Sequence, residues 1–406
     1  MRAEVTSSIP FFLHDLGSAE ATAFEGALAD PILTSGDAVT EFEKRFAATL
    51  GRAHAIGVTS STAALHLSLL ALRVGPGDEV ITSPLAFVGT ATAIIESGAR
   101  IVFADVEPDT GNLDPERIEA AITPRTRAIV PVHLYGQMAD MRAIHAIADR
   151  HGLRVIEDAS HSIEGRRDGV GPGEVGDAAC FSFYATHSLT CGEGGAVVTD
   201  SDELAARLRS LRLYGVTKTG ADRTREGYLP WDMTDLGLKC GLDNLHAAIL
   251  LPQLHRLEAN LLRRHDLAAE YERRLVRIHD LWWPRTRPHV VHARHLFPVW
   301  VGRGRRDELM GALQSRGIGV SVNYPAVHLL TYFRQRFGYV PGDFPATERI
   351  SASALSLPLY PRLPLERVGE IASVIAEVLG RVGQKDRRPT ATVSQPPEQA
   401  TTTTST

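Results

Sequence analysis

Short apolar runs alternate with helical stretches through the first 158 residues, and this order restricts the possible folds more than any other feature of the chain. Strands are predicted over residues 54–58, 79–82, 100–104, 127–132 and 153–158. Helices are predicted around and between them, over residues 39–50, 62–72, 85–95, 114–122 and 141–151. Strands that alternate with helices are typical of a mostly parallel sheet with helices on both faces. The sequence therefore predicts a doubly wound α/β fold.

Polar residues follow several of these apolar runs directly. Ser60, Ser83, Asp158 and His187 each stand at or just after the carboxyl end of a predicted strand. In open α/β sheets, ligands bind in the crevice beyond the carboxyl ends of the strands. We therefore expect these four side chains to lie near a binding site.

The composition excludes several classes of protein. Of 406 residues, 44% are hydrophobic and 22% are charged, and a net charge of −5 arises from interspersed acids and bases. This gives no sign of a nucleic-acid partner or a polybasic membrane-binding segment. No apolar run reaches the ~18–20 residues that a membrane helix needs. The three cysteines are scattered and the first residues lack a signal peptide's apolar core, so we expect a cytoplasmic protein.

The second half of the chain predicts a smaller domain and a tail. A helix over 204–213 and a long loop over 215–235 precede one long helix, or two abutting helices, over 242–271. A strand over 295–301, a helix over 306–316 and a strand over 319–323 follow. We expect a large domain over 1–255, which includes an N-terminal arm with a helix at 19–28, and a small α+β domain over 256–382. Residues 383–406 are rich in Pro, Thr and Gln, which predicts a disordered tail.

Residues 178–200, AACFSFYATHSLTCGEGGAVVTD, carry the most informative motif. An apolar strand over 178–184 leads into a small polar turn with His187 at its centre. A glycine-rich reversal and a second strand over 196–198 follow. This stretch resembles the active-site motif of the DegT/StrS family of pyridoxal-phosphate (PLP)-dependent sugar aminotransferases, F-S-F-Y-A-T-K-x-L-T-x-G-E-G-G. His187 stands where that family has the lysine that binds the cofactor covalently.

Further segments carry the same resemblance over about residues 9–380. They include SSTAA after the strand over 54–58, VIEDASHS at 155–162, LGLKCGLDNLHAAI at 236–249, and GIGVSVNYPAVH at 317–328. The resemblance implies the aspartate-aminotransferase fold (fold type I), with PLP or its amine form, pyridoxamine phosphate (PMP), as cofactor. It also implies a homodimer with active sites at the subunit interface.

Two of these motifs have a physical reading of their own. A helix that begins after a strand, as at Thr62 and Ala63, offers free backbone N–H groups to an anion, although a Ser or Thr there can also be a plain N-cap. A carboxylate at the end of a buried strand, as at Asp158, can keep a pyridine nitrogen protonated, although it can also cap a helix. The spacing alone leaves both choices open.

The resemblance assigns roles residue by residue. It implies that Thr62 and Ala63 hold the cofactor phosphate, that Phe87 stacks on its ring, and that Asp158 pairs with the ring nitrogen. The remaining cofactor residues that it implies are His161, near the phenolic oxygen, Ser182, and Lys239, which reaches the phosphate in the neighbouring subunit. It implies Tyr324 and His328 as substrate-binding residues.

The exchange of lysine for His187 changes the expected chemistry. Imidazole cannot form a stable covalent link with PLP, but it is a competent general base near neutral pH. Within the superfamily, a histidine here resembles the 3-dehydratases of nucleotide-linked 4-keto-6-deoxysugars, which use PMP. That resemblance implies a non-covalent cofactor, a nucleotide-sugar substrate and removal of the C3 hydroxyl with His187 as base. Because the cysteines do not cluster, it favours the type in which glutamate regenerates the amine over the iron–sulfur type.

Two other functions stay open. The turn reads A-T-H-S, as in ordinary aminotransferases, rather than P-A-H-H, so a sugar aminotransferase in which His187 or Lys239 does the work remains possible. A non-catalytic relative that binds cofactor or a partner protein is the third. The residues His289, His292 and His295 have a metal-like spacing, but alternation along a strand separates them, so we predict no metal site and expect His295 to pack in the small domain.

Overall fold

The computed structural model describes residues 8–217 and 230–380. The disordered tail predicted over 383–406 lies outside the described residues, as does most of the loop predicted over 215–235. No described helix has the length and apolar character needed to cross a membrane. No group of three or more His, Cys, Asp or Glu side chains in the described ranges is placed to hold a metal ion.

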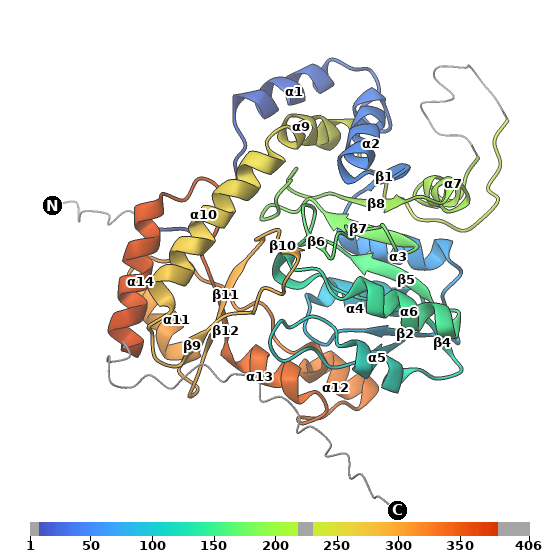
Figure 1. The fold of residues 1–406 in the computed structure, drawn as a ribbon. Coiled ribbons are helices and arrows are strands. Elements are labelled where there is room, and N and C mark those ends of the chain that lie inside the picture. Colours follow the sequence, from blue (N-terminus) through green and yellow to red (C-terminus); the bar gives the residue numbers. More distant parts are fainter. Residues whose placement is uncertain (1–7, 218–229, 381–406) are drawn as a thin grey trace, which may run out of the picture.

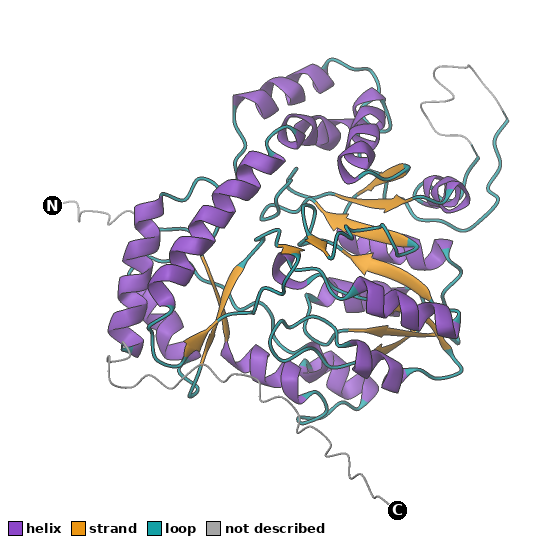
Figure 2. Ribbon diagram, viewed as in Figure 1, coloured by secondary structure: helices purple, strands orange, loops and turns teal. Residues whose placement is uncertain are grey.

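A seven-stranded sheet forms the centre of the larger part of the molecule (Figures 1 and 2). Its strands lie in the order β1 (His54–Val58), β8 (Gly195–Thr199), β7 (Ala178–Ser182), β5 (Arg154–Asp158), β4 (Thr126–Val130), β2 (Glu79–Thr82) and β3 (Arg100–Phe103). Only β8 runs antiparallel to its neighbours within this sheet. The predicted mostly parallel α/β fold is therefore confirmed.

Alternate side chains of the central strands enter different cores, which is why these runs are apolar throughout. Val80 and Ile156 pack in the core on one face, and their neighbours Ile81 and Val155 pack in a core on the other. The helices over the first face are α3 (Ser61–Ala71), α4 (Val88–Glu96) and α7 (Asp202–Leu211). The second face is covered by α2 (Asp37–Leu50) and α9 (Asn244–Leu254) at one end and by α5 (Pro115–Ala121) and α6 (Met141–His151) at the other. The sheet is thus the middle of three layers.

A second, antiparallel sheet has the order β12 (Ala354–Leu357), β11 (Phe297–Val301) and β9 (Leu281–Trp282). One face packs on α10 (Leu257–Leu275), α11 (Arg306–Ser315) and α14 (Leu365–Leu379), which Figure 1 shows on the opposite side of the molecule from α7. From the other face, Trp300 packs against Leu85 and Tyr135, which follow β2 and β4 of the large sheet. This contact carries residues of the C-terminal part toward the ends of the large-sheet strands.

The remaining elements are short or peripheral. They are α1 (Ser18–Leu28), α12 (Thr331–Phe337), α13 (Pro345–Ser353), the 3-10 turns η1 (Leu134–Gly136) and η2 (Val327–Leu329), and the two-stranded sheet of β6 (Arg166–Arg167) and β10 (Val290–Val291). Helix α1 packs on α9, at the end of the molecule from which α10 runs toward the small sheet (Figure 1).

Two sequence-based expectations need correction or refinement. The strand predicted over 319–323 is wrong: Ser321 makes one isolated bridge to Ser356, and the adjacent Ile318 makes another to Ile9. The helical region predicted over 242–271 consists of two abutting helices, α9 and α10, which meet near the predicted domain boundary. The boundary itself stays a prediction.

Candidate functional site

A cavity of about 550 Å³ lies beyond the carboxyl ends of β1, β5 and β7. It brings together residues that are up to 313 positions apart in the chain, from Phe11 to Tyr324. The residues predicted from the sequence that line it are Thr62, Phe87, Asp158, His161, Ser182, His187 and Tyr324. The predicted location at the strand ends is therefore where the structure places most of these side chains.

Asp158, the last residue of β5, is 7% exposed and is held by three hydrogen bonds. The hydroxyl of Thr90 donates to Oδ2 at 2.6 Å, and the N–H and hydroxyl of Ser160 donate to Oδ1 at 3.2 and 2.6 Å. All three donors are neutral, so in the described structure the carboxylate has hydrogen bonds but no cation beside it. A buried carboxylate of this kind is suited to pair with a cationic ring N–H group in the cavity.

Helix α3 begins at the cavity wall with Ser60 as its N-cap. The Ser60 hydroxyl accepts a hydrogen bond from the N–H of Ala63 at 3.1 Å, so Ala63 contributes to the cap and does not line the cavity. Strand β8 passes very close to Ser60, since a Cβ atom at Gly195 would lie 2.5 Å from the Ser60 carbonyl carbon. Ser61 and Thr62 do line the cavity, where the first turn of the helix favours an anion.

Three imidazole rings form a cluster along one wall of the cavity. The centroid of the His295 ring lies 4.2 Å from that of His161 and 4.5 Å from that of His187, and the His161 and His187 centroids are 5.7 Å apart, so the three rings form a triangle. The planes of His295 and His187 differ by only 8°. Burial, and next the neighbouring His161, lower the pKa of His187 to about 3, and burial lowers the pKa of His161 to about 3. Both rings are therefore neutral at neutral pH.

The hydrogen bonds of His161 fix its tautomer. Its Nδ1 accepts from the N–H of Tyr135 at 3.3 Å, so in the neutral ring the proton is on Nε2, which lies 3.0 Å from the Tyr324 hydroxyl oxygen. Burial raises the pKa of Tyr324, so this hydroxyl keeps its own hydrogen at neutral pH. Tyr324 can therefore donate a hydrogen bond to a group in the cavity.

Three other predicted residues do not line this cavity in the described chain: Ser83, Lys239 and His328. Ser83 is buried, and its hydroxyl accepts a hydrogen bond from the Leu85 N–H at 3.0 Å. Lys239 is exposed and pairs through its backbone with Leu213. His328 is fully buried, with Nε2 3.1 Å from the Glu348 carboxylate, and its ring packs on Phe344. Within one chain, His328 supports the packing around η2 instead of facing the cavity.

The sequence did not single out several residues that line the cavity, among them Thr90, Ser160, Tyr184 and Glu193. Ser160 had a local signal, since a serine two residues after an aspartate commonly closes such a turn. Thr90 had none, because only the packing of α4 brings it to Asp158. His295, which we expected to pack in the small domain, is buried and packs on the two cavity histidines.

The cavity fits the cofactor that the sequence resemblance implies. A planar pyridine ring needs an apolar face and a partner for its nitrogen, and its phosphate needs free N–H groups. Phe87 presents a ring that is 63% exposed at the cavity wall, Asp158 supplies a buried carboxylate, and α3 supplies its first turn. Asp158 and the N-terminus of α3 are held by their own hydrogen bonds in the described structure.

Comparisons with known proteins show the family of this chain. The model of the DegT/DnrJ/EryC1/StrS aminotransferase family matches residues 14–376. The spore coat polysaccharide biosynthesis protein SpsC of Bacillus subtilis (strain 168) is 41% identical over 377 residues, which are 91% of this chain and 97% of that protein.

Solved structures with the same fold include two sugar-enzyme relatives. Spr1654 from Streptococcus pneumoniae in its PMP form has a TM-score of 0.85 at 28% identity, covering 91% of this chain and 98% of that chain; its PLP form is equally similar, with a TM-score of 0.85. DesI, solved in the presence of its TDP-sugar product, has a TM-score of 0.80 at 32% identity, covering 89% and 90%. This chain is an enzyme of the DegT/DnrJ/EryC1/StrS aminotransferase family, with PLP or PMP as its cofactor.

Proposed function

We propose that this protein removes the C3 hydroxyl of a nucleotide-linked 4-keto-6-deoxysugar, with PMP held non-covalently and His187 as the base. The observation that carries the proposal is His187 itself, which lines the cofactor cavity at the position of the family's lysine. When bound, the cofactor supplies an amine for the sugar's keto group and an electron sink.

The scarcity of lysine supports a non-covalent cofactor. The chain has four lysines, Lys44, Lys218, Lys239 and Lys385, and none of the residues that line the described cavity is among them. Lys218 and Lys385 lie outside the described residues. The groups left to hold the cofactor are the Asp158 carboxylate, the first turn of α3 and the Phe87 ring.

His187 is suited to move a proton at C4′ of the cofactor. Its ring is neutral because burial lowers its pKa, and its buried Nδ1 has no hydrogen-bond partner among the described residues. It could take the C4′ proton and deliver it to the departing C3 hydroxyl, so that the C–O bond breaks and water leaves. Tyr324, whose hydroxyl keeps its hydrogen, is placed to donate to the cofactor or the sugar.

A sugar aminotransferase is the second candidate, because Lys239 is exposed. A side chain that does not face its own cavity is free to reach the cavity of a second copy of the chain. In this form of the proposal, Lys239 of a neighbouring subunit supplies the amine that His187 lacks. A non-catalytic relative is the third candidate, and detectable turnover would rule it out.

The proposal also covers the amino donor, the oligomeric state, the location and the substrate class. Glutamate would regenerate PMP from PLP, and the protein would act as a homodimer in the cytoplasm on a nucleotide sugar. The DesI structure, which contains a TDP-sugar product, supports this substrate class by analogy.

Product analysis distinguishes the two catalytic candidates. The protein is incubated with PLP, glutamate and a nucleotide-linked 4-keto-6-deoxyhexose, and the products are identified by mass spectrometry. Loss of water from the sugar is the expected result. Gain of an amino group with the C3 hydroxyl retained would establish an aminotransferase instead.

Borohydride reduction tests how the cofactor is held. We expect no pyridoxyl-lysine after reduction of the PLP-loaded protein, because no lysine lines the described cavity. Peptide mapping is decisive here, since only four lysines have to be followed. A label on Lys239 that disappears in Lys239→Arg would contradict non-covalent binding and favour the aminotransferase; Lys44→Arg, which changes a lysine outside the cavity, is the matched control.

A further inference from the structure

His295 reaches the cavity from a different part of the chain than the two histidines that it touches. It lies two residues before β11, whereas His187 follows β7 and His161 follows β5. The next residue, Leu296, donates its backbone N–H to the Tyr135 carbonyl at 3.3 Å. This hydrogen bond anchors the segment that carries His295. The position of His295 is therefore set by backbone contacts outside the histidine cluster.

The rings of His295 and His187 are close together and nearly parallel. Their centroids are 4.5 Å apart and their planes differ by 8°. Neither ring has a hydrogen bond to the other among the described residues, so proton transfer between them is not what the geometry favours. Two neutral rings packed in this way restrict rotation of the outer one about its side-chain bonds.

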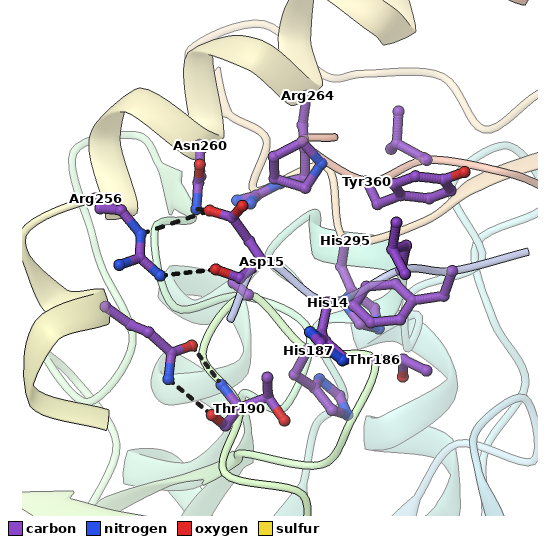
Figure 3. A pocket seen from close by; sticks show the side chains of 16 residues that line it. His14, Asp15, Thr186, His187, Thr190, Arg256, Asn260, Arg264, His295 and Tyr360 are labelled. Carbon is purple, nitrogen blue, oxygen red and sulfur yellow. Dashed lines mark hydrogen bonds and ion pairs between the residues drawn. The ribbon is translucent and has the colours of Figure 1, made fainter. Parts of the chain in front are cut away.

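A second, smaller cavity adjoins the first, and Figure 3 shows the side chains that line it. Thr186, His187 and His295 line both cavities and so form the wall between them. The second cavity has a volume of about 30 Å³, enough for a water molecule, and its polar lining includes Asn260. His14, also in its lining, is exposed, so this cavity is close to solvent.

We propose that His295 is a positioning residue: it fixes the plane of the His187 ring and closes the wall between the cofactor cavity and the water-sized cavity behind it. This inference rests on the proposed role of His187 as the base. A base must point at the atom it deprotonates, and a displacement of about 1 Å can cost about 10²-fold in rate. A closed wall also keeps water from the outer cavity away from the reacting groups.

Three substitutions separate ring packing from hydrogen bonding. His295→Phe keeps a flat ring that fills the wall but has no polar atoms. His295→Asn keeps polar atoms but has no ring, and His295→Ala removes both the ring and the polar atoms. His289→Asn is the control, because His289 is exposed, lies outside both cavities, and has a positive φ of 56° that asparagine tolerates. Circular dichroism first establishes that each variant is folded.

The first measurement needs neither cofactor nor turnover. The ring of His187 is titrated by NMR in histidine-labelled, cofactor-free protein, and its signal is assigned by its loss in His187→Asn. Wild type, His295→Phe and the control should titrate well below the ordinary histidine value of about 6.5. In His295→Asn and His295→Ala, water that enters through the opened wall should stabilise the imidazolium and move the His187 titration upward. His161 and Asp158, the other titratable groups that influence His187, are unchanged in all four variants.

The second measurement is the kinetics of the loaded enzyme. The kcat of His295→Asn and His295→Ala should fall by about 10²-fold with the KM for the nucleotide sugar nearly unchanged, and His295→Phe should keep most of the activity. Unchanged titration and unchanged kcat in His295→Ala would overturn the inference, and so would a His295→Asn variant that equals His295→Phe. If the wild type proves not to dehydrate sugars while the titrations shift as expected, the proposed function fails and the positioning of His187 by His295 stands.

Discussion

Replacing Asp158 with asparagine should reduce kcat by at least about 10²–10³-fold, the usual cost of removing one preorganised electrostatic contact. The carboxylate is 7% exposed and has no cation beside it in the described structure, so its charge is available to a protonated ring nitrogen. Asparagine has the same shape but no charge, and the ring nitrogen would lose its proton. The electron sink would then be lost without removal of the cofactor's other contacts.

The fold of Asp158→Asn should remain intact. The asparagine oxygen can still accept the hydrogen bonds from Ser160, and the Thr90 hydroxyl can rotate to accept instead of donate. Turnover and thermal unfolding are measured together with Asp177→Asn, which changes a carboxylate paired with Arg154 outside the cavity. Full activity in Asp158→Asn would show that this carboxylate is not the partner of the ring nitrogen.

Replacing His187 should change the rate in one variant and the product in another. In His187→Asn the base is lost, so dehydration should slow by about 10²–10⁴-fold, the usual contribution of a general base. In His187→Lys we expect the covalent bond to PLP to return, because FSFYAT before the turn and GEGG after it match the lysine-bearing pattern. Lysine can release the amine product from the cofactor, so this variant should give amino sugar and less dehydrated sugar.

The three proteins are compared by mass analysis of products and by borohydride mapping, which should find pyridoxyl-lysine at position 187 only in His187→Lys. His255→Asn, which changes a histidine outside both cavities, controls for the loss of an imidazole. If wild type gives amino sugar and His187→Asn does so equally well, His187 takes no part in the reaction. That result would rule out the dehydratase.

The sequence predicted the central sheet closely because those strands are buried on both faces. The bounds predicted for β1 and β2 agree with the structure, since each is a short apolar run that ends at a polar residue. The prediction over 319–323 failed because alternation alone does not supply a partner strand. Ser321 finds only one bridge, to Ser356.

The sequence predicted those residues of the candidate site that lie within a single local motif. Asp158, Thr62 and His187 each end or follow a recognisable strand, and all three line the cavity. The contact of His295 with His187 could not be predicted, because it depends on how the small sheet packs over Tyr135 and on a separation of 108 positions in the chain. A local sequence pattern cannot predict a contact between two rings that meet only when the large and small sheets pack together.

The hydrogen bonds around Asp158 have a consequence for binding affinity. Thr90 and Ser160 come from different segments, α4 and the turn after β5, and both hold the carboxylate through hydrogen bonds of the protein itself. The conformational entropy of the Asp158 side chain is therefore lost during folding, and binding of a small molecule does not cost it a second time. This preorganisation matters most where the cofactor is not bound covalently, because the fraction of protein that carries the cofactor then depends only on the dissociation constant and on the free cofactor concentration.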